Sequence, residues 1–143
     1  MAKKVMLIGA GGVAGVAAAK MCQNPGTFGE LLIASRTEAR CAAIKADVAR
    51  RVAEGRGAWA QAQANATKVS TARLDAMDVA ATTAMIKAFK PDLVMNIALP
   101  YQDLAIMDAC LAAGVSYLGN IHQSRKNTLH ILITPKIITA HPI

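Results

Sequence analysis

The feature that most constrains the fold is the segment Gly9-Ala10-Gly11-Gly12-Val13-Ala14, which follows a short apolar run. That run, Val5–Ile8, has the length and composition of a strand buried on both faces. After the glycines, Val13–Cys22 is predicted to be a helix that ends at Asn24-Pro25-Gly26. A G-x-G-x-x-A sequence between a strand and a helix is typical of a turn that holds the pyrophosphate of a dinucleotide.

Each small residue of this segment has a physical role in such a turn. Gly9 allows the tight turn, Gly11 lets the backbone approach a pyrophosphate, and Ala14 lets the helix pack closely on the strand. The start of the helix adds free N–H groups and the positive end of the helix dipole. The alternative is a glycine-rich turn that binds no ligand, although several glycines would then cost conformational entropy without a compensating contact.

The rest of the chain alternates between apolar runs of strand length and helical segments. The further predicted strands are Glu30–Ala34, Val69–Leu74, Leu93–Ala98 and Val115–Leu118. The further predicted helices are Glu38–Val52, Ala80–Phe89 and Asp103–Ala113. Residues 54–68 either extend the second helix or form a loop. The pattern predicts an α/β fold, a Rossmann-like doubly wound parallel sheet of about five strands with helices on both faces.

The end of the second predicted strand carries Ser35, Arg36 and Thr37. A NAD site usually has a carboxylate here, bonded to the ribose 2′-hydroxyl, but this sequence has none. Two hydroxyls and a planar cation suit a 2′-phosphate, so the sequence predicts NADP(H) as the cofactor. Arg36 could also stack on the adenine, and Arg40 lies one helical turn further on. The alternative is a solvated Arg36 beside a helix capped by Ser35 or Thr37.

Polar residues also follow the third and fourth predicted strands, where ligands of open α/β sheets bind. Asp75 could contact the adenine or could form a plain turn. Asn96 and the backbone around Ala98 and Pro100 could line the nicotinamide ribose. For Asn96 the alternative is a buried amide that bonds neighbouring backbone.

Composition excludes several other classes. The chain of 143 residues is 54% apolar and 17% charged, which excludes a disordered protein, and 3% aromatics exclude a base-stacking platform. Its net charge of +7 is spread over several predicted elements, so we expect no nucleic-acid partner. No apolar run is long enough to span a membrane, so we expect no membrane partner. The spacing of the three cysteines and three histidines predicts no metal site, and a reducing cytoplasm is the natural setting.

The sequence changes character after Leu118. All nine acidic residues precede this point, and all three histidines follow it. We therefore expect residues 1–118 to form a NADP-binding Rossmann domain and residues 119–143 to form a divergent tail. The apolar segments Ile131–Ile133 and Ile137–Ile138 would either cover the sheet edge or pair with a second copy to give a homodimer.

Two sets of segments resemble a known family. The first set resembles the NADP-binding domain of the saccharopine dehydrogenase family: Lys4–Val13, Ile33–Thr37 and Lys90–Val94. The second set is closer still to its carboxynorspermidine dehydrogenase branch: Asn96–Leu104 and Ile106–Cys110. The resemblance covers residues 3–118, and Ala14 replaces a glycine that this branch often shows.

The resemblance implies an oxidoreductase of polyamine biosynthesis. Aspartate β-semialdehyde and a diamine would form an imine, and NADPH would deliver a hydride to its carbon. The resemblance also assigns residues to the cofactor: Gly9, Gly11, Gly12 and Val13 to the pyrophosphate, Ser35, Arg36 and Thr37 to the 2′-phosphate, Asp75 to the adenine side, and Ala98 to Pro100 to the nicotinamide side.

From Gly119 onward the sequence departs from the family pattern. Family members are much longer and carry a separate substrate and dimerisation domain, which we expect to be absent from this chain. Our hypothesis is a truncated or frame-altered product that binds NADP(H) without turnover, and we assign no catalytic residue. The alternative is a non-enzymatic NADP-binding or sensor module.

Overall fold

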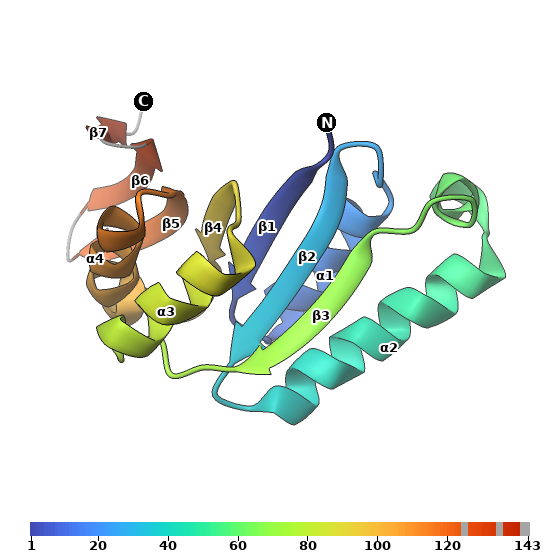
Figure 1. The fold of residues 1–143 in the computed structure, drawn as a ribbon, viewed down its shortest axis with the longest axis horizontal. Coiled ribbons are helices and arrows are strands. Elements are labelled where there is room, and N and C mark those ends of the chain that lie inside the picture. The colour runs from blue at the N-terminus through green and yellow to red at the C-terminus, as the bar shows by residue number, and fades with distance from the viewer. Residues whose placement is uncertain (124–125, 134–135, 141–143) are drawn as a thin grey trace.

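A computed structural model describes residues 1–123, 126–133 and 136–140, with side chains as far as Gly119. Within this part of the chain, seven strands form one sheet in the order β3-β2-β1-β4-β5-β6-β7 (Figure 1). The strands are β1 (Lys3–Ile8), β2 (Phe28–Ser35), β3 (Lys68–Arg73), β4 (Leu93–Asn96), β5 (Ser116–Gln123), β6 (Lys126–Ile133) and β7 (Lys136–Ala140). The α-helices are α1 (Gly12–Cys22), α2 (Glu38–Glu54), α3 (Val79–Phe89) and α4 (Asp103–Ala113).

The first five strands form the parallel sheet that the sequence predicts. β1 pairs with β2 on one side and with β4 on the other, while β3 and β5 extend the two sides. The strands β6 and β7 add antiparallel pairs to the edge beside β5, which the sequence did not establish. β5 also continues to Gln123, five residues beyond its predicted end at Leu118. The domain boundary at residue 118 and the homodimer stay predictions.

Helices cover both faces of the sheet, as predicted, because alternate residues of each strand point to opposite sides. Met6 and Ile8 of β1 pack in the core against α3 and α4. Val5 and Leu7 pack in a second core against α1 and α2. Figure 1 shows α3 and α1 on opposite sides of the strands. Fully burying one Val, Leu or Ile side chain stabilises the fold by roughly 1.5–3 kcal/mol of transfer free energy. The aliphatic side chains therefore supply most of the stabilisation of this core.

The structure resolves the ambiguous segment 54–68. The helix α2 ends at Glu54, and Gly55 follows in the left-handed conformation with φ 59°. A short 3₁₀ helix η1 (Gly57–Ala62) then buries Trp59 against the α1 and α2 face. The segment is therefore neither a continuation of the helix nor a plain loop.

Two helices end at a residue in the left-handed conformation just before the next strand. Gly114 ends α4 with φ 69°, whereas Lys90 ends α3 with φ 56°. Lys90 is the one non-glycine residue with positive φ among the described residues. A Cβ in this conformation is strained, whereas glycine adopts it freely.

We expect Lys90→Gly to raise the free energy of unfolding by about 1 kcal/mol, because it removes this strain. Gly114→Lys places the same side chain at the equivalent position of α4 and should lower the free energy of unfolding by about the same amount. Urea titration followed by circular dichroism measures both changes. Equal midpoints for the three proteins would contradict the assignment of strain to these helix ends.

Candidate functional site

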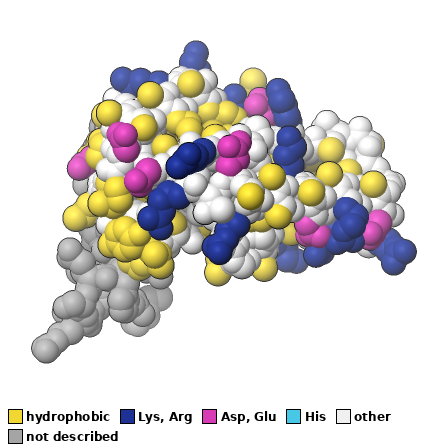
Figure 2. Space-filling model, turned by 90° about the horizontal axis from the view of Figure 1, so that it is seen from below, with side chains coloured by type: hydrophobic (Ala, Val, Ile, Leu, Met, Phe, Trp, Pro, Cys, Tyr) yellow, Lys and Arg dark blue, Asp and Glu magenta, His cyan; other side chains and the backbone are white. Residues whose placement is uncertain are grey.

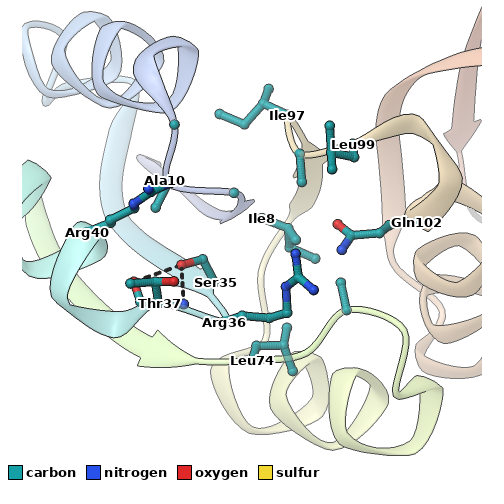
Figure 3. A pocket seen from close by; sticks show the side chains of 14 residues that line it. Ile8, Ala10, Ser35, Arg36, Thr37, Arg40, Leu74, Ile97, Leu99 and Gln102 are labelled. Carbon is teal, nitrogen blue, oxygen red and sulfur yellow. Dashed lines mark hydrogen bonds between the residues drawn. The ribbon is translucent and has the colours of Figure 1, made fainter.

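A cavity lies at the carboxyl ends of β1 to β4, where the sheet order reverses between β1 and β4. Ligands of open α/β sheets bind at this switch point. The cavity is an open cleft of about 370 Å³ (Figure 3). Its walls come from residues 8–11 after β1, 35–37 and 40 after β2, 74 and 76 after β3, and 97–99 and 102 after β4.

Gly9 is required by the protein's own packing. Its φ is +118°, a conformation that residues with a side chain rarely adopt. A Cβ on Gly9 would lie 3.0 Å from the backbone nitrogen of Ala98, so the chain after β4 passes directly against it. The N–H of Gly9 donates a 2.9 Å hydrogen bond to the carbonyl of Ala34 in β2. Gly9 thus joins three neighbouring strands at the base of the cleft.

Gly11 and Gly12 differ from Gly9 because, among the described residues, no packing contact requires them to be glycines. A Cβ at either position would meet no atom within 4 Å, and Gly11 has an ordinary φ of −86°. Gly11 is the N-cap of α1 and provides no side-chain hydrogen bond to the free N–H groups of the first turn. The bare backbone therefore leaves space for a phosphate beside unpaired donors, which is what a pyrophosphate site needs.

The next two residues of the motif face different surroundings. Ala14 is fully buried in the core shared by β1 and α1, so a small residue does allow the close packing that the sequence indicated. Val13 is 67% exposed on the first turn of the helix. Their contact with a cofactor stays a prediction.

The turn after β2 is organised by Ser35. Its hydroxyl donates to the carbonyl of Thr37 at 3.0 Å and accepts from the N–H of Thr37 at 3.1 Å. The thiol of Cys41 donates to the same oxygen at 3.3 Å. Thr37 is the N-cap of α2 and makes no side-chain capping hydrogen bond. Ser35 therefore shapes the turn, and its contact with a 2′-phosphate stays a prediction. The Thr37 hydroxyl makes no capping hydrogen bond and is the better placed of the two to donate to a ligand.

Two arginines give the cleft a positive charge. Arg36 and Arg40 both line it, and no Asp or Glu is among its lining residues. Figure 3 shows Arg36 extending toward Gln102 and Arg40 extending toward Ala10. Neither guanidinium forms an ion pair among the described residues. The sequence pointed to Arg40 only as a residue one turn beyond Arg36; Arg36 precedes the N-cap of α2, whereas Arg40 lies in the first turn of that helix.

Asp75 forms a turn rather than a wall of the cleft. Its carboxylate accepts a 3.0 Å hydrogen bond from the N–H of Met77, and its side chain is exposed. The neighbouring Leu74 and Ala76 are buried and line the cleft with apolar surface. This geometry matches the plain-turn alternative for Asp75, and its contact with an adenine stays a prediction.

The segment after β4 forms the opposite wall. Ala98 lines the cleft with Ile97 and Leu99, whereas Pro100 begins a 3₁₀ helix, η2 (Pro100–Gln102). Asn96 is buried, and its amide oxygen accepts a 2.9 Å hydrogen bond from the N–H of Ala98. This hydrogen bond matches the alternative that the sequence left open for Asn96, a buried amide that bonds neighbouring backbone.

No group with an evident role in proton transfer or nucleophilic attack lines the cleft among the described residues. The three cysteines are buried, and burial raises the pKa of the Cys22 thiol to about 11 and that of Cys110 to about 12. Such thiols stay protonated and are poor nucleophiles. The described residues hold no cluster of three or more metal-binding side chains. The histidines lie outside the residues whose side chains the structure describes, and the absence of a metal stays a prediction.

The surface gives two further observations. On the face drawn in Figure 2, Lys and Arg side chains are scattered and interspersed with acidic ones, as on an ordinary solvated surface. Across the described residues, no helix has the length and apolarity needed to cross a membrane. The expectations of no nucleic-acid partner, no membrane partner and a cytoplasmic location stay predictions.

Comparison with known proteins agrees with this geometry. Residues 5–130 match the family model described as the saccharopine dehydrogenase NADP binding domain. A carboxyaminopropylagmatine dehydrogenase from Synechocystis is 45% identical over 115 residues, which is 80% of this chain and 25% of that protein. A carboxynorspermidine synthase from Vibrio alginolyticus is 38% identical over 119 residues, 80% of this chain and 26% of that protein. The chain thus spans about a quarter of the length of these curated relatives.

Solved structures share the fold at low sequence identity. Apo saccharopine dehydrogenase (L-Glu forming) from Saccharomyces cerevisiae superposes with a TM-score of 0.60 at 15% identity, covering 86% of this chain and 22% of that one. The Escherichia coli protein MccB gives a TM-score of 0.63 at 14% identity, covering 94% of this chain and 39% of that one. These likenesses establish the Rossmann-like fold. The family match over residues 5–130 shows that the chain belongs to the saccharopine dehydrogenase NADP-binding domain family.

Proposed function

We propose that the cleft at the switch point binds NADP(H). The observation that carries this proposal is a cleft lined by two arginines and no carboxylate. Next to them lies Gly11, where no described residue would contact an added side chain. Arg36, Arg40 and the Thr37 hydroxyl would hold the 2′-phosphate, because guanidinium groups bind phosphates through charge-assisted hydrogen bonds. The backbone at Gly11 and Gly12 would hold the pyrophosphate.

The two sides of the cleft suit the two halves of this cofactor. The side formed after β2 and β3 carries both positive charges and the apolar Leu74 and Ala76, which suits a phosphorylated adenosine. The side formed after β4 carries Ile97, Ala98 and Leu99 and no charge. We place the nicotinamide half on this second side.

Bound NADPH supplies a hydride. We propose that the reaction of the whole protein is a reductive condensation, in keeping with the names of the two curated relatives. An amine and the aldehyde of aspartate semialdehyde would lose water to form an imine. The imine carbon would receive the hydride and its nitrogen a proton, giving a secondary amine and NADP⁺. The residues of this chain would bind and orient the nucleotide in that reaction.

We further propose that these 143 residues bind the nucleotide without turnover. The support is that no described residue lining the cleft could readily donate the proton that the imine nitrogen needs. The same observation favours the second candidate function, a non-enzymatic NADP-binding or sensor module.

The turnover proposal is tested by mixing the chain with NADPH, aspartate semialdehyde and a diamine. We expect the absorbance of NADPH to decay at the rate of a protein-free control. A faster, protein-dependent decay with formation of the secondary amine would show that these residues suffice for the reaction.

The 2′-phosphate assignment predicts a preference for NADPH over NADH. We expect Arg36→Ala and Arg40→Ala each to weaken NADPH binding roughly tenfold or more, because each removes hydrogen bonds to a charged group. NADH binding should change little in either variant. Isothermal titration calorimetry measures all of these affinities.

Arg50→Ala is the matched control for these variants. Arg50 lies on the same helix as Arg40 but forms ion pairs with Asp47 and Glu54, and it does not line the cleft. Its replacement should leave NADPH affinity unchanged. Equal affinity of the native chain for NADPH and NADH would contradict the 2′-phosphate assignment.

We expect two substitutions in the glycine turn to distinguish its role in NADPH binding from its role in the stability of the fold. Gly11→Ser should preserve stability, because serine is a favoured N-cap and its Cβ meets no atom. It should nevertheless weaken NADPH binding, because the side chain occupies the space of the phosphate. Gly9→Ala should lower the free energy of unfolding by about 1–3 kcal/mol through backbone strain.

Urea unfolding and calorimetric titration of both variants measure these effects. Full NADPH affinity in Gly11→Ser would show that no phosphate approaches this backbone.

A further inference from the structure

A buried polar cluster lies at the end of β4, between this strand, the first half of β5 and the start of α4. Its members are Asn96, Asp103 and Tyr117, which are 6%, 1% and 0% exposed. The Asn96 amide nitrogen donates a 2.6 Å hydrogen bond to Oδ1 of Asp103, and the Tyr117 hydroxyl donates to the same oxygen. The other carboxylate oxygen, Oδ2, is buried and makes no hydrogen bond to a described residue. Within the part of the chain that the structure describes, Asn96 and Tyr117 are thus the two side chains that donate to this carboxylate.

The cluster is directly connected to the wall of the cleft. The amide of Asn96 that donates to Asp103 also accepts the N–H of Ala98 through its oxygen, at 2.9 Å. Ala98 lines the cleft and lies against Gly9. A change in the position of the Asp103 carboxylate would thus reach the backbone of the segment after β4 through the side chain of Asn96.

The surroundings keep this cluster in one arrangement. Asp103 is the first residue of α4, where the helix dipole stabilises a negative charge. Gly119 lies beside Asn96 in the next strand, and a Cβ there would clash with the Tyr117 hydroxyl and lie 2.8 Å from Oδ1 of Asp103. Burial and the hydrogen bond to Asp103 raise the pKa of Tyr117 above its ordinary value, so its hydroxyl stays protonated and remains a donor.

We propose that Asp103, held by Asn96 and Tyr117, is a positioning residue that fixes segment 97–102 as the wall for the nicotinamide half of the nucleotide. It acts through Asn96 and Ala98 and does not itself line the cleft. Because β4 lies on the opposite side of β1 from β2 and β3, the adenosine half is held by other elements. Only the binding readout of this inference rests on the proposed function.

The test uses the variant Tyr117→Phe. We measure its affinity for two ligands and, without any ligand, the rate of amide hydrogen exchange. We expect NADPH affinity to fall about fivefold, because one of two donors to a buried carboxylate is lost. Adenosine 2′,5′-bisphosphate, which lacks the nicotinamide half, should bind the variant and the native chain equally. Without any ligand, the amide of Ala98 should exchange with deuterium faster in the variant, while that of Gly9 is unchanged.

The matched control is Thr67→Val, which removes a buried hydroxyl bonded to the carbonyl of Phe28 near the start of β3, away from the cleft. It should change neither ligand affinity nor exchange at Ala98. Asn96→Leu removes both hydrogen bonds of the Asn96 amide at once. Its effects on NADPH affinity and on exchange at Ala98 should therefore be larger than those of Tyr117→Phe. Thermal unfolding of each variant reports general destabilisation.

The outcomes separate this inference from the proposed function. Equal losses for both ligands, or unchanged exchange at Ala98, would overturn the positioning role. If the native chain binds neither ligand, the proposed function fails, and the exchange measurement alone then decides the positioning role.

Discussion

The contact between Gly9 and the backbone of Ala98 is the constraint on which the site depends. It brings the end of β1 against the chain that leaves β4, at the point where the sheet order reverses. Hydrogen bonds from Gly9 to Ala34 and from Ile97 to Ile8 hold the same three strands together. With these ends fixed, the chain must diverge on both sides of β1, and the cleft lies between the diverging segments.

The cleft is asymmetric in charge, and this asymmetry follows from the strand order. Arg36 and Arg40 both come from the connection after β2, so their charge lies on one side of β1. The segment after β4 contributes apolar residues and Gln102 on the other side. A ligand with a phosphorylated end and a less charged end would be oriented by this difference alone, without any group that takes part in a reaction.

In the function that we propose, this domain holds a nucleotide, and the reaction with a substrate depends on other groups. The chain spans about a quarter of its curated relatives, and the described cleft carries binding groups without an evident proton donor. Two of its polar side chains shape the walls: the partly buried Ser35 organises the turn after β2, and the buried Asn96 holds the segment after β4.

Much of the fold could be predicted from local sequence. The buried runs, the glycine turn and the basic end of β2 depend on residues adjacent in the chain, so the parallel sheet and a basic turn at the end of β2 were predictable. Segment 54–68 was not, because Trp59 is placed by packing against distant helices. The partners of Asp103 were not predictable either, because they lie 7 and 14 residues away along the chain.

The sequence by itself therefore determined the succession of β1 to β5 and α1 to α4 along the chain, the glycine turn after β1 and the positive charge after β2. These features follow from composition and spacing. Only the tertiary structure decided which glycine is required by packing and which leaves open space. It also decided that Asn96 supports the wall of the cleft through its backbone contact. The physical reason is that the close approach of two backbones and the choice of hydrogen-bond partners depend on which distant segments come together in the fold. A local sequence pattern carries no information about such contacts.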